Sequence, residues 1–354
     1  MSRPEEPATS KIEAVHALLQ QLDLSPEQLL AGTRGPGRPV PTFDEYVPQV
    51  AAAVTPGTRS LYSTYWQRVR HQWGSRRINE PTALEIQTLA EQARTAAVTR
   101  SNSRGGGSAA EHMIAALRCL YRYAIADGLI SETANPAARV PKPRRPAATR
   151  QALNPDSLAQ IIKVAAKTGD DPHLDLLLLR LHLETACRRG GALALRRRDL
   201  DTGQCLLWLR EKGRTSRWQP ISPTLAAALA DHHAERGDND PQGRLLRYRN
   251  GRPVGRRRYD YLWKRLGEHL PWVATRHVSA HWLRHTTLTW VERHCGYAVA
   301  RAYADHDPSS DAGTTATYVK ATLEEVARAL AALTGESHPL APAEELRDTR
   351  LPLP

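Results

Sequence analysis

Hydrophobic side chains recur at helical spacing through residues 42–135. In segment 58–73 every fourth residue from Leu61 onward is hydrophobic, and segment 109–127 has a comparable face that ends at Gly128. This period is typical of amphipathic helices that bury one face. We therefore expect a compact bundle of about four helices here.

The pattern changes partway through residues 151–335. Asn154 and Pro155 mark a helix start, and a second helical run is expected over Leu174–Leu195. Two short β-prone runs then predict a hairpin, Ser222-Pro223 marks the start of another helix, and helices return in three later segments. The runs are Cys205–Leu209 and Arg217–Ile221, and the later helices are Tyr259–His269, Ala280–His294 and Thr322–Leu333. The fold class predicted is mainly α (α+β), with one small antiparallel sheet.

Composition divides the chain into five parts. Segment 136–150 is rich in proline and basic residues and has no acid, so it is expected to be an extended linker. Either it lies along a phosphate backbone or it is a solvated hinge. The expected parts are an N-terminal tail or small helical region (1–41), a helical domain (42–135), the basic linker (136–150), a second domain (151–335) and a disordered Pro-rich tail (336–354).

The charge suggests a polyanionic partner. Lys plus Arg number 49 against 37 Asp plus Glu, a net charge of +12. Nearly all of the cations are Arg, which suits bidentate phosphate recognition, although a GC-rich genome also favours Arg codons. The cations cluster in segments 135–150, 188–198 and 243–265, which favours local DNA-binding surfaces. The candidate phosphate contacts are Arg139, Lys142, Arg144, Arg145, Arg197, Arg256 and Arg257.

Other protein classes are disfavoured. No run of 18 apolar residues predicts a membrane span, and the first residues lack the apolar core of a signal peptide. The four cysteines form no CxxC pair, which favours a reducing cytosol over a disulfide framework or a zinc knuckle.

Three local patterns could carry chemistry. Arg188 and Arg189, in TACRRGGALAL, follow an apolar run, so at least one of the two should be partly enclosed. A buried guanidinium needs an anionic partner, and a structural ion pair is the plainer interpretation. His281, Arg284 and His285 share a face of an expected helix. This histidine pair also suits zinc, but Trp282 stands where the metalloprotease pattern needs Glu, so zinc is the weaker interpretation. Tyr318 follows Asp305-His306 in TTATYVKA, and taken alone it would be a half-buried packing residue.

Taken in order, these patterns resemble the phage-integrase family of tyrosine site-specific recombinases. The match comprises Arg188, Lys212 in REKGRTSRWQPI, His281 with Arg284 in HWLRHTT, His306 in ADH, and Tyr318. It covers about residues 42–335, with the helical first half resembling the core DNA-binding domain.

The resemblance implies a catalytic role for each of these residues. Tyr318 would attack a DNA phosphate and form a 3′-phosphotyrosyl link, while Arg188, Arg284 and His306 stabilise the charge on its oxygens. Lys212 would be the general acid, and His281 would position or deprotonate Tyr318. No metal ion, ATP or other cofactor is expected.

Three departures from the family pattern are visible. Gly191 stands where the family has an acidic residue, and Asp199 or Glu184 could replace it. Asp305 stands where a glycine is usual, and the spacing from His306 to Tyr318 is longer than common.

The resemblance also implies partners. They are double-stranded DNA at attachment sites, gripped as a clamp between the two domains, and three further copies of the chain in a homotetramer. It allows for a directionality factor, and it places the protein in a bacterial cytoplasm at the nucleoid, where it would integrate or excise a mobile element. Segment 322–333 would dock either on a neighbouring protomer or in its own subunit. The alternatives are a non-catalytic DNA-binding protein on the same scaffold and a type IB topoisomerase-like enzyme.

Overall fold

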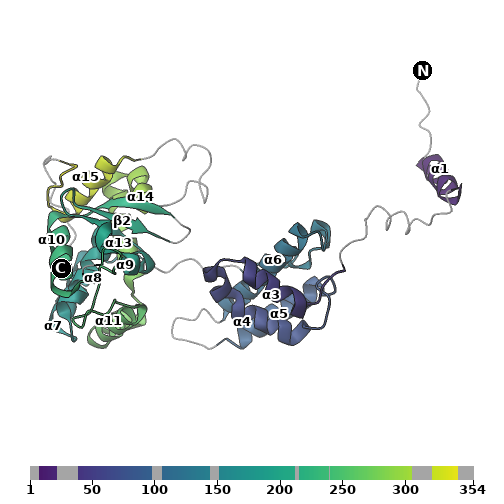
Figure 1. The fold of residues 1–354 in the computed structure, drawn as a ribbon, viewed down its shortest axis with the longest axis horizontal. Helices are drawn as coiled ribbons and strands as arrows, with labels where there is room; N and C mark the ends of the chain where they lie inside the picture. Colours follow the sequence, from purple (N-terminus) through teal and green to yellow (C-terminus); the bar gives the residue numbers. More distant parts are fainter. Residues whose placement is uncertain are drawn as a thin grey trace, which may run out of the picture. The chain divides into compact units, whose positions relative to one another are not determined.

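The computed structural model separates the chain into two compact units, 1–147 and 148–354. Each is described by itself below (Figure 1). The residues that the structure describes are 8–21, 39–97, 106–143, 151–211, 215–238, 240–304 and 321–341. Within these ranges, no helix is long and apolar enough to cross a membrane.

Four helices pack together in the described part of the first unit, as the periodicity predicts. They are α3 (Phe43–Ala53), α4 (Pro56–Trp73), α5 (Ala83–Thr95) and α6 (Gly107–Ala126). Large side chains fill the core, and polar groups that enter it are satisfied: Trp66 Nε1 donates to the Ala116 carbonyl at 3.1 Å, and the Tyr121 hydroxyl donates to the Ile78 carbonyl at 2.9 Å.

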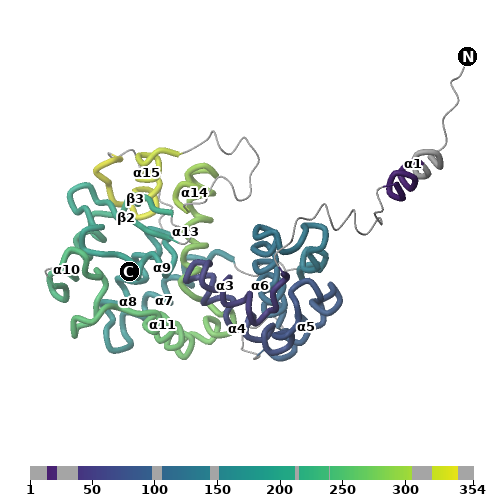
Figure 2. Tube along the Cα trace, turned by 45° about the vertical axis from the view of Figure 1, so that its right-hand side comes forward, coloured from purple at the N-terminus to yellow at the C-terminus, as the bar shows by residue number. Residues whose placement is uncertain are grey.

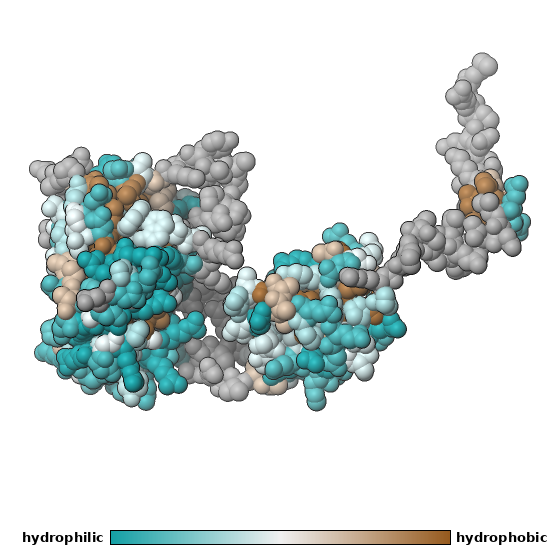
Figure 3. All heavy atoms as spheres, viewed as in Figure 1, coloured by the Kyte–Doolittle hydropathy of each residue, from teal (hydrophilic) through white to brown (hydrophobic). Residues whose placement is uncertain are grey.

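The helix α1 (Ala8–Gln21) precedes this bundle. Val15 and Leu18 on it are more than half exposed, at 53% and 58%. Figure 3 shows hydrophobic and hydrophilic residues on different sides of α1, whereas the visible faces of both units are mainly hydrophilic. The helix is therefore amphipathic.

The first residues of the expected linker pack on the helical unit. Ala137 and Val140 are buried, and Arg118 donates to both of their carbonyls, at 3.1 and 2.8 Å. A short 3₁₀ helix, η2 (Pro136–Ala138), stands here. Residues 136–140 are thus part of the first unit, while residues 144–150 lie outside the described ranges. The domain boundaries given above stay a prediction.

The second unit is mostly helical. Its helices are α7 (Pro155–Lys167), α8 (Pro172–Thr185), α9 (Arg189–Ala194), α10 (Pro223–Arg236), α11 (Arg256–His269), α12 (Pro271–Thr275), α13 (Ala280–Cys295), α14 (Tyr297–Ala304) and α15 (Leu323–Thr334). The predicted start of α7 is confirmed: the Asn154 side chain accepts from the Ser157 amide at 2.8 Å. The short helices α12 and α14 were not predicted.

The predicted hairpin is confirmed, and with it the fold class. Strands β2 (Leu206–Arg210) and β3 (Ser216–Pro220) are antiparallel, with Leu206 opposite Pro220 and Arg210 opposite Ser216. A two-residue strand, β1 (Leu200–Asp201), completes the sheet in the order β1-β2-β3. Figure 2 shows β2 and β3 beside α15. This register places the residues after β2 at the start of the hairpin tip.

The single helix expected over Leu174–Leu195 is wrong, because the chain breaks between α8 and α9. Ala186 adopts the left-handed conformation, with φ of 48°, which ends α8. Its carbonyl accepts a hydrogen bond from Arg284, a contact over 98 residues that no local pattern reveals. The break leaves Arg188 in an extended conformation immediately before α9.

The helix α15 packs within its own subunit. Its side chains Leu330 and Leu333 are fully buried in the core of the second unit, together with residues of α7, α8 and α13. Of the two positions considered for segment 322–333, the structure shows packing in the same chain.

Candidate active site

Arg188 lies at the turn that leads from α8 into α9. Its backbone N–H donates to Oε1 of Glu211 at 2.8 Å, and its Nη1 donates to Oε2 of the same carboxylate. The side chain is 35% exposed, whereas the Glu211 side chain is fully buried. The guanidinium is thus fixed at one end and remains accessible from solvent.

Arg284 reaches the same carboxylate from α13. Its side chain is 4% exposed, and its Nη1 lies 4.0 Å from Oε2 of Glu211. Nη1 also donates to the Ala186 carbonyl, and Nη2 donates to the Ala304 carbonyl at 2.6 Å. Burial, and next the charge of Arg188, lowers the pKa of Arg284 to about 10, so it stays protonated at neutral pH.

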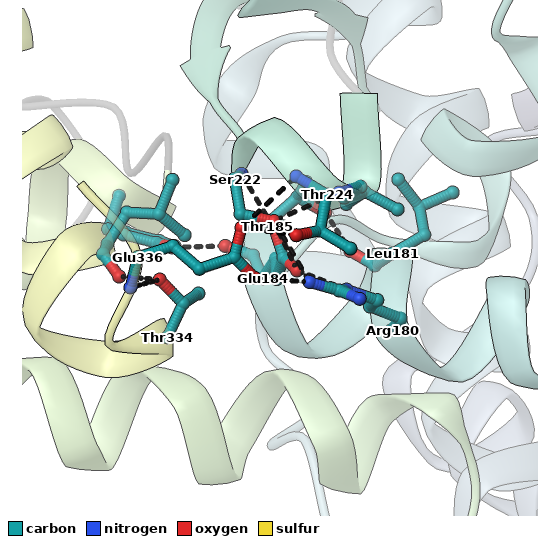
Figure 4. A network of polar contacts seen from close by, with 11 residues as sticks. Arg180, Leu181, Glu184, Thr185, Ser222, Thr224, Thr334 and Glu336 are labelled. Carbon is teal, nitrogen blue, oxygen red and sulfur yellow. Dashed lines mark hydrogen bonds and ion pairs between the residues drawn. The ribbon is translucent and has the colours of Figure 1, made fainter. Parts of the chain in front are cut away.

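The carboxylate beside both arginines comes from Glu211, which no sequence pattern indicated. It directly follows β2, and its N–H donates to the Thr215 carbonyl at 2.9 Å across the hairpin. The two acids considered for this role are engaged elsewhere. Asp199 binds Arg210 at 2.5 and 2.6 Å, and Glu184 binds Arg180 at 2.6 Å and the Ser222 amide at 2.8 Å (Figure 4).

His281 lies at the start of α13, one turn before Arg284, and is exposed. It lines a pocket of about 470 Å³ together with Arg188, Tyr259 and Trp263. Arg188 and His281 therefore face one cavity, as the resemblance implies for two groups that act on one phosphate. His285 contacts Thr289 Oγ1 at 3.5 Å instead. Within the described ranges, no three His, Cys, Asp or Glu side chains form a group that could hold a metal ion.

The other three expected catalytic residues, Lys212, His306 and Tyr318, lie outside the described residues. Two of them are nonetheless tied to the site by the chain. Lys212 directly follows Glu211 in the sequence. His306 is two residues beyond Ala304, whose carbonyl binds Arg284 at 2.6 Å.

Buried hydrogen bonds of His182 with Cys187 and Tyr259 support the turn at Arg188. His182 Nδ1 lies 2.9 Å from the Cys187 carbonyl, and Nε2 lies 2.9 Å from the Tyr259 hydroxyl. Because a carbonyl only accepts, the proton sits on Nδ1, and Nε2 accepts from Tyr259. Burial lowers the pKa of His182 to about 4, so the ring is neutral.

The candidate DNA contacts in the second unit differ in how they are held. Arg256 and Arg257 are exposed in the first turn of α11. Their neighbour Arg258 is 5% exposed and donates to Asp170 at 2.6 Å and to Asp175 at 2.8 Å. Arg197 is half-buried, and its Nη1 donates to the Leu200 carbonyl at 3.3 Å.

The candidate contacts near the expected linker are described in part. Arg139 and Lys142 are exposed, and Arg139 Nη2 donates to the Thr133 carbonyl at 2.8 Å. Arg144 and Arg145 lie outside the described residues. The assignment of all seven residues to DNA stays a prediction.

Comparisons with known proteins give the family. Residues 151–325 match the model of the phage integrase family. The curated relatives include tyrosine recombinase XerC of Xanthomonas campestris pv. campestris, which is 26% identical over 234 residues, covering 65% of this chain and 70% of the relative.

Solved structures share the fold. A lambda integrase tetramer bound to a Holliday junction superposes with a TM-score of 0.58 at 14% identity, covering 91% of this chain and 89% of that one. The Tn1549 transposon integrase in complex with circular intermediate DNA gives a TM-score of 0.57 at 16% identity, covering 81% and 98%. Through residues 151–325, this chain belongs to the phage integrase family of tyrosine recombinases, enzymes that cleave and rejoin DNA.

Proposed function

We propose that the protein is a site-specific recombinase that integrates or excises a mobile element through a 3′-phosphotyrosyl intermediate. The observation that carries the proposal is the pair Arg188 and Arg284, which come from the turn before α9 and from α13 to the buried carboxylate of Glu211. Arg188 faces the open pocket, and the buried Arg284 lies behind it at the same carboxylate. Two guanidiniums held in this way suit a phosphodiester that gains negative charge during reaction.

Tyr318 is the proposed nucleophile. Its phenolic oxygen attacks the phosphorus, a new bond forms between them, and the bond from phosphorus to the 5′-oxygen of the next nucleotide breaks. The tyrosine proton passes to His281, and Lys212 supplies a proton to the departing 5′-oxygen. The freed 5′-hydroxyl of another strand then attacks the phosphotyrosine and releases Tyr318, so the strands are rejoined without a net change in bond type.

The arginines stabilise the transition state. Arg188 and Arg284 donate to the non-bridging phosphate oxygens, with His306 as a further donor. Removal of one preorganised donor of this kind typically costs about 100- to 1,000-fold in rate. Neither a metal ion nor ATP enters the proposed step.

Duplex DNA at attachment sites is the proposed substrate, held by both units and by the seven basic residues named above. Lambda integrase forms a tetramer on a Holliday junction, and the shared fold supports a homotetramer here. A directionality factor is a further proposed partner, and the DNA substrate places the protein at the nucleoid of a bacterial cytoplasm.

Covalent trapping tests the proposal. The purified chain is incubated with a pool of labelled, nicked duplexes whose central sequence is randomised, and adducts that survive SDS and heat are captured and sequenced. We expect adducts enriched for one sequence. A chain that binds DNA but forms no adduct would be a non-catalytic binding protein.

A second assay separates recombinase from topoisomerase. Two plasmids carrying the enriched sequence should recombine with each other. Relaxation of a supercoiled plasmid that lacks the sequence, without recombination, would favour the type IB topoisomerase-like alternative.

A further inference from the structure

Both arginines of the candidate site lie beside one acidic side chain. Glu211 Oε2 accepts from Arg188 Nη1 and lies 4.0 Å from Arg284 Nη1, while Oε1 holds the Arg188 backbone at 2.8 Å. We propose that Glu211 is the positioning residue that holds Arg188 and Arg284 side by side for the scissile phosphate. This inference rests on the proposed function.

Burial makes this carboxylate necessary for the pair. The Glu211 side chain is fully buried and that of Arg284 is 4% exposed, so neither charge is solvated by water. The two positively charged guanidiniums lie near the same carboxylate and repel each other. A buried charge without a partner of opposite sign is strongly unfavourable. A carboxylate between them offsets the repulsion and leaves each guanidinium with further N–H groups for a phosphate.

Gly191 provides the space that Glu211 occupies. A Cβ at position 191 would lie 3.4 Å from Glu211 Oε1, 3.4 Å from its Cγ and 3.4 Å from the Arg210 carbonyl. A methyl group just fits there, and a longer side chain would meet the carboxylate. Gly191 is one turn of α9 beyond Arg188, at the position where an acid is expected from the resemblance. In the structure, the acid in that space is the residue that follows β2, and α9 contributes none there.

The position of Glu211 in the chain links the arginines to the proposed general acid. Lys212 is the next residue in the sequence, and the Glu211 N–H donates to the Thr215 carbonyl at 2.9 Å. The acid beside the two arginines and the proposed general acid are therefore neighbours in the sequence. An acid on α9 would lack this second connection.

A set of four variants tests the inference on the full-length chain. Glu211→Gln keeps the shape and removes the charge, and Glu211→Ala removes the carboxylate. Gly191→Glu adds an acid to the occupied space, and the double variant Glu211→Ala/Gly191→Glu moves the acid to α9. Glu235→Gln, an exposed carboxylate on α10, is the matched control.

Three quantities are measured: the single-turnover rate of adduct formation at saturating trapped duplex, the affinity for that duplex, and the midpoint of thermal unfolding. For Glu211→Gln we expect the rate to fall about 100-fold while affinity stays within about twofold, because misplaced donors act on the transition state. The double variant should recover most of the rate that Glu211→Ala loses, whereas Gly191→Glu alone should be slower than the wild type. The control should match the wild type in all three.

The result that overturns the inference is a wild-type rate in Glu211→Gln, or a double variant no faster than Glu211→Ala. A wild-type chain that forms no adduct refutes the proposed function instead. In that case the midpoint of thermal unfolding tests the role of Glu211 without a catalytic readout. A midpoint that falls in Glu211→Ala and is restored in the double variant supports the inference that Glu211 holds the arginines in place. A midpoint unchanged in both single Glu211 variants overturns it.

Discussion

At the scale of single residues, the site is defined by where charges are buried. Arg284 is enclosed and its pKa is lowered to about 10, mainly by burial, whereas Arg188 is one-third exposed. The two arginines therefore have different surroundings while sharing the carboxylate of Glu211. Arg284 is held mainly by backbone carbonyls, and Arg188 is the one open to the pocket with His281.

Sequence reasoning identified these arginines but not their partner. Motif order singles out Arg188 and Arg284, because each stands in a recognisable local context. Glu211 belongs to no such pattern, and its contact with Arg188 spans 23 residues and depends on the hairpin register. An acid directly before the hairpin lysine was the available signal. The sequence does not show that Asp199 and Glu184 pair with other cations, which leaves Glu211 as the acid beside the arginines.

The buried His182 predicts a pH dependence of stability. Its pKa is about 4 in the folded protein, below the unperturbed value of about 6.5. Between these values the unfolded chain binds a proton that the folded chain excludes, so stability is full above pH 6.5 and is lost as the pH falls toward 4.

We expect His182→Gln to reduce this loss. Chemical denaturation from pH 7 to pH 5 should show a slope that is shallower by up to about 1.4 kcal/mol per pH unit. His232, whose pKa is also about 4 because of burial, should contribute separately. His269→Gln, at the exposed end of α11, is the control. An unchanged slope in His182→Gln would contradict the neutral, buried assignment.

At the scale of elements, a polar network joins α15 to α8 and α10. Glu336, just beyond α15, accepts from Arg180 Nη2 at 2.8 Å and from the Thr224 hydroxyl at 2.6 Å. Arg180 also binds Glu184, which holds the Ser222 amide at the start of α10 (Figure 4). The end of α15 is therefore fastened to its own subunit by charge as well as by hydrophobic packing.

Removing Glu336 should loosen this attachment. Glu336→Ala is expected to lower the free energy of unfolding by about 2 kcal/mol, because hydrogen bonds to charged groups typically contribute 1.5–3 kcal/mol. Chemical denaturation measures the change, with the exposed Glu292→Ala on α13 as the control. Equal stabilities for the two variants would mean that α15 is held by its apolar face alone.

Element prediction succeeded where the signal was local and failed where it was not. The start of α7 at Asn154 and the hairpin follow from capping and β-propensity, both of which act within a few residues. The break occurs at Ala186, which has a left-handed conformation and whose carbonyl accepts a hydrogen bond from Arg284. Alanine favours helix, so the sequence does not predict a helix end at this position. The break places Arg188 outside α8, immediately before α9.

At the scale of the whole molecule, the cations behind the net charge of +12 differ in their surroundings. Arg256 and Arg257 are exposed, whereas Arg258 is buried against Asp170 and Asp175. Adjacent arginines on one helix are thus divided between the solvent-exposed surface and an internal ion-pair network.

This division predicts opposite effects of substitution. Arg256→Ala/Arg257→Ala should weaken duplex binding and reduce the slope of log affinity against log salt by about 1 for each phosphate that is no longer neutralised, with stability unchanged. Arg258→Ala should lower the unfolding midpoint, because Asp175 is left with Arg265 alone as its described cation partner. Salt titrations of DNA binding and thermal unfolding measure the two. An unchanged salt slope in the double variant would remove Arg256 and Arg257 from the DNA surface.

The central claim is that Tyr318 carries the DNA strand during reaction. The direct measurement incubates wild type, Tyr318→Phe and Tyr297→Phe with the trapped, labelled duplex and counts label that remains on protein after SDS and heat. Tyr297 lies on α14 with 57% exposure and serves as the matched tyrosine control. We expect adducts for wild type and Tyr297→Phe and none for Tyr318→Phe. An adduct that persists in Tyr318→Phe would contradict it.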